Sequence, residues 1–178
     1  DVNALDADEI IVATGSKARR IPVKGADTAI EAVDFLLGNA EVGENVTIIG
    51  GGLTGCEIAY ELFLQGKKPT IVEMQDDLIT TKGICLANTS FLRDCFKTNK
   101  VPVHLETALC EIGDGFVTVK DKEGKVFNID SDSVIMSVGY SPAPVANKGK
   151  HIHVIGDAAK VGNLRTVIWG AWDVCMKL

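Results

Sequence analysis

The chain has 178 residues, of which 46% are hydrophobic and 24% charged, and its formal net charge at pH 7 is −6. This length and composition are typical of one globular domain, or of one domain with a smaller attachment. Its basic residues form only short pairs such as Lys67-Lys68, which argues against binding to nucleic acid or to an anionic membrane surface. We find no apolar run near the roughly 20 residues that span a bilayer, and the acidic start of the chain is unlike a signal peptide. We therefore expect a cytoplasmic protein with neither nucleic-acid nor membrane partners.

The cysteines are odd in number, widely spaced and never in a C-x-x-C pair, which predicts neither a zinc site nor a dithiol redox centre. They are Cys56, Cys85, Cys95, Cys110 and Cys175. We expect most of them to be small buried hydrophobic residues in a reducing compartment.

Apolar runs alternate with segments of helical periodicity along the chain. The first half predicts a strand at 9–13, a helix at 28–38, a strand at 46–50, a helix at 53–65 and a strand at 69–73. The second half predicts a helix at 86–98, a strand at 101–105, hairpins turning at 114–115 and 123–124, a buried strand at 133–139, a linker at 141–150, and a last strand before a helical tail. This order predicts an α/β fold with a central parallel sheet and a small antiparallel β-meander.

A glycine-rich turn lies between the strand at 46–50 and the helix that follows. Gly50, Gly52 and Gly55 satisfy G-x-G-x-x-G, and Gly51 makes three glycines in a row. In this strand–turn–helix context Gly50 permits a tight turn, Gly52 lets a pyrophosphate lie against the backbone, and Gly55 allows close packing of helix on strand. The motif predicts a dinucleotide site in a three-layer Rossmann-like domain of the FAD/NAD(P)-binding type.

The residues after the turn complete the pattern. The N–H groups around Leu53 and Thr54 begin the helix and would meet phosphate charge at the favourable end of the helix dipole. Glu73 follows Gly55 by 18 residues, at the end of the next strand. There a carboxylate can accept hydrogen bonds from ribose hydroxyls and repel a 2′-phosphate, which favours NAD over NADP. The alternative is a glycine-rich helix start without a ligand, and an ordinary surface glutamate.

The order of these segments resembles the flavin-linked pyridine-nucleotide oxidoreductases. The resemblance rests on IIVATGSKARRIPVKG, AVDFLLG, VTIIGGGLTGCEIAYEL, TIVEM, IMSVGY and HVIGDA, which together cover nearly the whole chain. It is greatest to the carboxyl-terminal part of the NADH:flavin oxidoreductases that include 2,4-dienoyl-CoA reductase, enoate reductase and trimethylamine dehydrogenase. The resemblance implies that NADH passes hydride to FAD, and that electrons continue through an iron–sulfur cluster and FMN to an unsaturated acyl or enoate substrate.

The resemblance also implies roles for individual residues. Glu57 would lie near the nicotinamide carboxamide, Met74 would follow Glu73 in the nucleotide site, and Gly139 would line the dinucleotide cleft. Thr14 and Gly15 would mark where the chain leaves the FAD domain, and Gly156 and Asp157 would approach the ribityl–pyrophosphate region of the flavin. The alternatives are that Glu57 is an exposed helical residue and that Asp157 caps the following helix.

The resemblance is incomplete, because the family's first glycine turn, which holds FAD, has no counterpart in this sequence. We therefore predict a remnant of an FAD-binding domain at 1–40, an NAD(H)-binding domain at 41–141, and a linker with a second remnant of the FAD-binding domain at 142–178. FAD belongs to the parent enzyme and is not expected to be retained, and FMN and the iron–sulfur cluster belong to parts absent from the sequence.

The sequence predicts no independent catalytic residue and no metal site. His104, His151 and His153 have no obvious partner at motif spacing, and His151-x-His153 puts two imidazoles on one face of a strand without a recognisable third ligand. Trp169 and Trp172 are expected to pack against a neighbour.

Three functions remain open at this point. The chain is an NADH-binding part of a larger flavoenzyme, a non-catalytic ADP-binding domain as in the trimethylamine dehydrogenase branch, or an interaction module. The corresponding partners are NADH or ADP, the remaining domains of the parent flavoenzyme, and a second copy in a homodimer. Whether the isolated chain is active is left open.

Overall fold

A computed structural model describes residues 2–178, which form two compact units. The larger unit is Arg20–Val138, and the smaller combines the residues up to Arg19 with Gly139–Leu178. The sequence places domain boundaries after residues 40 and 141, whereas the chain passes between the units at 19–20 and 138–139.

The larger unit is built on a five-stranded sheet in the order β3-β10-β4-β5-β6, with every neighbouring pair parallel. Its strands are β3 (Ile30–Glu31), β4 (Asn45–Ile49), β5 (Lys68–Val72), β6 (Val103–His104) and β10 (Ser133–Met136). The central strand β4 is buried at every position from Val46 to Ile49, as expected for a strand covered on both faces.

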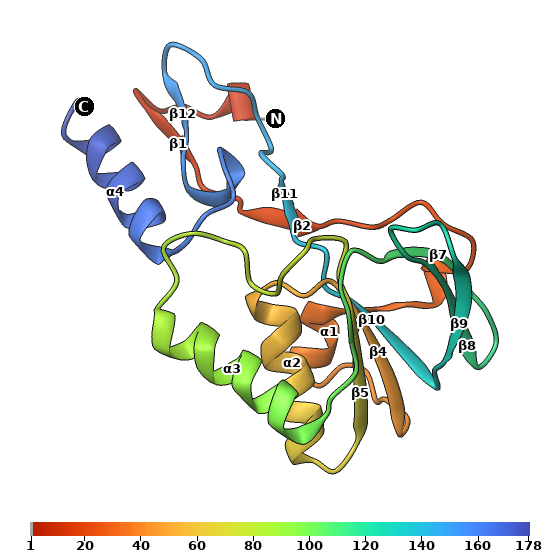
Figure 1. Ribbon diagram of the computed structural model, residues 1–178. Coiled ribbons are helices and arrows are strands. Elements are labelled where there is room, and N and C mark those ends of the chain that lie inside the picture. The colour runs from red at the N-terminus through yellow and green to blue at the C-terminus, as the bar shows by residue number, and fades with distance from the viewer. Residues whose placement is uncertain (1) are drawn as a thin grey trace. The chain divides into compact units, whose positions relative to one another are not determined.

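Helices cover one face of this sheet and a β-meander covers the other (Figure 1). The helices are α1 (Ala32–Leu36), α2 (Leu53–Leu64) and α3 (Leu86–Asn99). The antiparallel meander consists of β7 (Ala108–Ile112), β8 (Phe116–Lys120) and β9 (Val126–Asp130). This arrangement confirms the predicted three-layer α/β fold.

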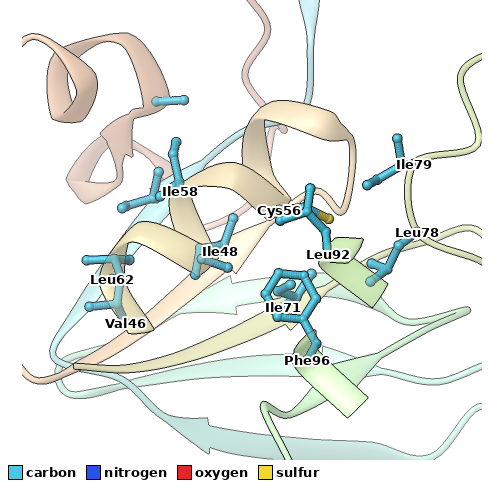
Figure 2. Close-up of a cluster of buried hydrophobic side chains, with 13 residues drawn as sticks. Val46, Ile48, Cys56, Ile58, Leu62, Ile71, Leu78, Ile79, Leu92 and Phe96 are labelled. Atoms are coloured by element: carbon cyan, nitrogen blue, oxygen red, sulfur yellow. The ribbon is translucent and has the colours of Figure 1, made fainter. Parts of the chain in front are cut away.

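Alternate residues of the central strands feed two separate cores, because successive side chains of a strand point to opposite faces. Ile48 and Ile71 join the core under the helices, with Ile58, Leu62 and Phe96. Figure 2 shows these side chains converging from β4, β5, α2 and α3. The core under the meander contains Ile49, Val72, Leu109, Val117, Val119 and Met136. Each fully buried aliphatic side chain is worth about 1.5–3 kcal/mol relative to an exposed one.

The predicted helix at 28–38 was wrong in its first half. The chain instead forms a short 3₁₀ helix, η2 (Ala26–Thr28), then β3, and only then α1. β3 pairs with Ile135 and Met136 at the edge of the sheet, and this long-range pairing overrides the local helical pattern. The predicted C-terminal stop was close, since Gly38 follows the helix with a φ of +73°.

The smaller unit contains two short pairs of strands. β1 (Ile10–Val12) runs parallel to β12 (Ile152–Val154), and β2 (Ser16–Ala18) runs antiparallel to β11 (Tyr140–Pro142). The start of the predicted linker at 141–150 therefore lies in a strand. The partner strand β2 was not predicted, because three residues carry too little periodicity to be recognised alone.

The smaller unit ends in a helix whose apolar face is exposed. After η1 (Val2–Ala4) at the start of the unit and η3 (Gly156–Ala158), α4 (Leu164–Cys175) begins with a capping box between Asn163 and Thr166. Trp169 and Trp172 are 57% and 58% exposed, so the smaller unit itself does not supply the neighbour expected for them. Among the helices of those residues, we find none with the length and apolar character needed to cross a membrane.

The cysteine prediction was wrong for most positions. Cys56 is buried, whereas Cys85 and Cys175 are exposed and Cys95 and Cys110 are half-buried. The reason lies in the elements that carry them, because Cys85 precedes α3 on the surface and Cys175 ends a helix that has no buried residues.

Candidate functional site: the glycine turn after the central strand

The three motif glycines have distinct backbone geometries. Gly50 has a φ of +108°, and a Cβ added there would lie 2.3 Å from the carbonyl oxygen of Ser137. A Cβ on Gly55 would lie 2.0 Å from the carbonyl oxygen of Gly50. A Cβ on Gly52 would meet nothing within 4 Å, and its φ of −66° is an ordinary value. Gly50 and Gly55 are therefore required by packing, whereas Gly52 faces open space.

The amino-terminal end of α2 presents free donors beside that space. The helix begins at Leu53, and the Cys56 N–H donates a hydrogen bond to the carbonyl of Gly52 at 3.0 Å. Within the described residues no acceptor reaches the N–H groups of Leu53, Thr54 or Gly55. The N-cap is a glycine and the first turn holds no acidic side chain, so this helix end can bind an anion.

Glu73 lies at the carboxyl end of β5 and is bonded to the glycine turn. Its Oε2 accepts a hydrogen bond from the Gly51 N–H at 2.5 Å, and its Oε1 accepts one from the Gln75 N–H at 2.8 Å. An ionised carboxylate has about four acceptor positions, so it can still accept bonds from two ribose hydroxyls. The next residue, Met74, is 69% exposed.

The carbonyl of Gly51 is also hydrogen-bonded within the protein. It accepts hydrogen bonds from the Ile79 N–H at 2.8 Å and from the Cys56 thiol at 3.4 Å. Leu78 packs so close that a Cβ on Gly51 would lie 2.5 Å from its Cδ2. Leu78 and Ile79 lie at the same end of the buried cluster as Cys56 (Figure 2). Burial raises the pKa of the Cys56 thiol to about 12, so it is a neutral donor at pH 7.

Arg93 on α3 is a site residue that the sequence did not reveal. Its Nε donates to Asp77 Oδ1 at 3.1 Å, and its Nη2 donates both to Asp77 Oδ2 at 2.9 Å and to the carbonyl of Leu78. The hydrogen bond from this guanidinium is the main cause of the lowered pKa of the Asp77 carboxyl. The pairing depends on how α3 packs beside the loop, which no local motif encodes.

The two residues expected nearest the nicotinamide are less constrained. Glu57 is exposed on α2, and its carboxylate makes no hydrogen bond within the described residues. Gly139 belongs to the smaller unit, has a φ of +84°, and accepts a hydrogen bond from the Arg19 N–H at 2.9 Å. Their proximity to nicotinamide stays a prediction.

Thr14 and Gly15 lie in the connection between β1 and β2 in the smaller unit. The Thr14 hydroxyl donates to the carbonyl of Ala143 at 3.0 Å, and the carbonyl of Gly15 accepts from the Ala143 N–H at 3.1 Å. Gly15 has a φ of +77°. These bonds explain the VATG motif structurally without reference to a flavin.

Gly156 and Asp157 form the start of η3 in the same unit. Gly156 has a φ of +60°, and the Oδ1 of Asp157 accepts from the Gly162 N–H at 3.1 Å. Asp157 thus closes the loop before α4, while Asn163 is the N-cap of the helix itself. The role expected for Asp157 beside a flavin stays a prediction.

Glu9 contacts both histidines of the H-x-H pair, a partner that the sequence did not reveal. His153 Nε2 lies 2.8 Å from Glu9 Oε2, and His151 Nδ1 lies 3.2 Å from Glu9 Oε1. Both contacts lower the pKa of the Glu9 carboxyl, and the contact with His153 has the larger effect. The pairing of Ile10 with Ile152 brings Glu9 close to the two histidines. Knowledge of the parallel register of β1 and β12 would have been needed to predict this contact. Among residues 2–178 we find no group of three side chains arranged to hold a metal ion.

The surroundings of His104 indicate a structural role. It ends β6, and partial burial lowers its pKa. Its ring lies 5.4 Å from that of Phe127, measured between centroids.

A groove of about 410 Å³ lies at the other end of the sheet. Asn45, Lys68 and Lys100 are among the residues that line it, and none of the predicted site residues does. Ligands of parallel α/β sheets bind at the carboxyl ends of the strands, where the glycine turn lies. We therefore place the candidate site at the turn.

Residues 1–154 match the model of the pyridine nucleotide-disulphide oxidoreductase family. The chain belongs to this family. It is 38% identical, over its full length, to cinnamate reductase from Clostridium sporogenes, of which it covers 28%. Over 99% of its length it is 32% identical to NADH oxidase from Thermoanaerobacter brockii, of which it covers 29%.

Two solved structures have a similar fold. A 2-naphthoyl-CoA reductase, in complex with 2-naphthoyl-CoA, is 25% identical and superposes with a TM-score of 0.82, covering 96% of this chain and 27% of its own. Thioredoxin reductase from T. acidophilum superposes with a TM-score of 0.69 at 20% identity over 95% of this chain and 63% of its own, which is a likeness of fold alone.

The comparisons identify the chain as a nucleotide-binding module of the flavin-linked oxidoreductases, a family that implies FAD and NAD(P) as cofactors. The chain spans less than a third of the length of these two curated relatives.

Proposed function

We propose that the chain is the NADH-binding module of a flavin-dependent reductase that acts on an unsaturated acyl or enoate substrate. The observation that carries this proposal is the adenosine half-site, in which open space beside Gly52, free donors at the start of α2 and the Glu73 carboxylate lie at one edge of the sheet.

The residues of the turn fit a dinucleotide. The N–H groups of Leu53 and Thr54 would hold the pyrophosphate, and Glu73 would accept hydrogen bonds from the adenosine ribose. NADH, when bound, supplies the hydride, while the protein binds and orients it. Glu73 repels a 2′-phosphate, and Arg93 is already paired with Asp77, so we propose NAD rather than NADP.

The substrate class rests on the relatives. Cinnamate reductase and 2-naphthoyl-CoA reductase are named for unsaturated substrates, which supports an enoate reductase-like parent. We also propose that the smaller unit belongs with an FAD-binding domain, which leaves out residues 20–40 because β3 and α1 lie in the larger unit. FMN and an iron–sulfur cluster would belong to other parts of the parent. The chain has no second glycine turn, and the Asp157 carboxylate is bonded to the Gly162 N–H, so its residues do not by themselves form an FAD site.

The apolar face of α4 supports a partner domain. Leu164, Ile168, Trp169 and Trp172 are each at least 57% exposed. We propose that the remaining domains of the parent flavoenzyme cover this face, with a homodimer as the alternative. Sedimentation equilibrium separates the two, because a concentration-dependent dimer that is lost on Trp172→Glu would contradict the partner-domain assignment.

A non-catalytic ADP-binding role is the second candidate function. It is favoured by one observation, namely that the exposed Glu57 carboxylate makes no hydrogen bond within the described residues. Storage of ADP needs only the turn and Glu73.

Calorimetric titration of the wild-type chain and Glu57→Gln with NADH and ADP distinguishes the two functions, with Glu61→Gln on the same helix as the matched control. The NADH role predicts that NADH binds at least about fivefold more tightly than ADP, a difference of about 1 kcal/mol, and that only Glu57→Gln reduces this ratio. Equal affinities that neither variant changes would favour ADP storage. If neither ligand binds, the proposed function is wrong.

A further inference from the structure

We infer that Arg93 is a positioning residue of the nucleotide site, and that it sets the direction of the Gly52 N–H through three linked contacts. This inference rests on the proposed function of the turn. Arg93 itself would not touch the nucleotide.

The first link joins α3 to the loop after β5. The guanidinium of Arg93 donates to both oxygens of Asp77 and to the carbonyl of Leu78. Such a fork-to-carboxylate pair fixes orientation as well as distance. The Arg93 side chain is 31% exposed and Asp77 is 56% exposed, so the pair lies at the rim of the core rather than within it.

The second link joins the loop to the glycine turn. Ile79 has a φ of +50°, a conformation that is rare and strained for a β-branched residue and persists only where its surroundings hold it. In that conformation its N–H donates to the carbonyl of Gly51, while its side chain is 4% exposed. The bonds of Arg93 to the two preceding residues hold this turn in place.

The third link is the peptide bond between Gly51 and Gly52. In a trans peptide the carbonyl and the N–H point in opposite directions. The carbonyl of Gly51 points inward, toward Ile79 and Cys56. The Gly52 N–H must therefore point away from them, and no acceptor reaches it within the described residues. An N–H so directed is a donor for the pyrophosphate of a nucleotide.

The experiment compares Arg93→Gln with Lys97→Gln in the whole chain. Both variants remove one positive charge from α3, and Lys97 is exposed. ADP is titrated calorimetrically, amide resonances are recorded by ¹⁵N–¹H NMR, and urea unfolding reports stability. Asp77→Asn is a second variant, chosen because an exposed carboxylate can be neutralised without opening the core.

We expect Arg93→Gln to weaken ADP binding at least about tenfold and Asp77→Asn about threefold, with Lys97→Gln unchanged. The Gly51 and Gly52 amide resonances should move in the first two variants and not in the control. A purely structural role for Arg93 would lower the urea midpoint without changing ADP affinity.

The outcomes separate this inference from the function on which it rests. If the wild type binds ADP and Arg93→Gln binds it within about twofold, the inference fails and the proposed function stands. If the wild type binds no ADP, the proposed function fails and the inference fails with it. Should Arg93→Gln not fold, unchanged ADP affinity and unmoved Gly52 resonance in Asp77→Asn would overturn the inference.

Discussion

The carboxylate of Glu73 accepts a hydrogen bond from the backbone N–H of Gly51 at 2.5 Å. This contact joins the end of β5 to the turn after β4, its neighbour in the sheet. The side chain proposed to bind ribose is thus fixed by the same turn that is proposed to bind pyrophosphate. Such preorganisation reduces the ordering cost of binding a ligand.

Replacing Gly52 should separate binding from stability. Gly52→Ala places a methyl group in open space at an ordinary φ, so we expect it to cost less than about 1 kcal/mol of unfolding free energy. The methyl would occupy space proposed for the pyrophosphate, so ADP affinity should fall at least about tenfold. Urea unfolding and calorimetry measure the two effects, and an unchanged ADP affinity would place the phosphates elsewhere.

Replacing Gly55 should have the opposite outcome for stability. Gly55→Ala puts a Cβ 2.0 Å from the carbonyl oxygen of Gly50, so α2 must move away from β4. We expect a loss of about 3 kcal/mol, at the upper end of the usual cost of overpacking. A urea midpoint equal to that of Gly52→Ala would show that the close approach of helix and strand is not required.

A hydroxyl in the central strand offers a stabilising substitution. Thr47 is 1% exposed, and its Oγ1 has no hydrogen-bond partner within the described residues. Thr47→Val keeps the side-chain shape and removes the buried unpaired hydroxyl, so the unfolding free energy should rise by about 1 kcal/mol. Thr107→Val is the matched control, because Thr107 is also buried but donates to the carbonyl of Leu105 at 2.7 Å. Thr107→Val should lower stability, and a loss in both variants would refute the assignment for Thr47.

Asp132 should contribute a pH-dependent part of the stability. Its Oδ2 accepts bonds from the N–H groups of Glu44 and Asn45 and from the Asn45 amide. The bond from the Asn45 backbone is the main cause of its lowered pKa, so the folded protein releases this proton more readily than the unfolded chain does. The stabilisation is therefore present above the ordinary pKa of 3.8 and is lost as the pH falls through the lower folded value.

Urea midpoints of Asp132→Asn against pH test this sign. At pH 7 the variant should unfold at lower urea than the wild type, and the difference should shrink below pH 3.8. Asp130→Asn, an exposed carboxylate on β9 that makes no hydrogen bond within the described residues, should show no such difference. A constant difference for Asp132→Asn at all pH values would exclude the carboxylate charge as its cause.

The order of the main elements was predictable because their signals are local. The apolar run of β4, the glycines, the helical periodicity of α2 and the apolar run of β5 lie within one segment of the chain. Glu73 could be placed because strand length fixes where β5 ends. By contrast, the two residues of β3 are defined only by pairing with β10, which is more than 100 positions away.

The supporting residues of the site could not be predicted for the same reason. Arg93 reaches Asp77 only because α3 packs beside the loop, and nothing in the spacing of the two residues indicates it. Glu9 meets His151 and His153 only through the register of β1 and β12, which joins the two ends of the smaller unit.

The most direct test is calorimetric titration of the wild-type chain and of Glu73→Gln with NADH and NADPH. The account predicts that the wild type binds NADH at least about tenfold more tightly than NADPH. Glu73→Gln should lose about 1.5–3 kcal/mol of NADH binding energy, the range for hydrogen bonds to a charged group, and most of its discrimination against NADPH. Equal binding of both nucleotides by the wild type, or an unchanged NADH affinity in Glu73→Gln, would contradict the assignment of the turn and Glu73 as the adenosine half-site.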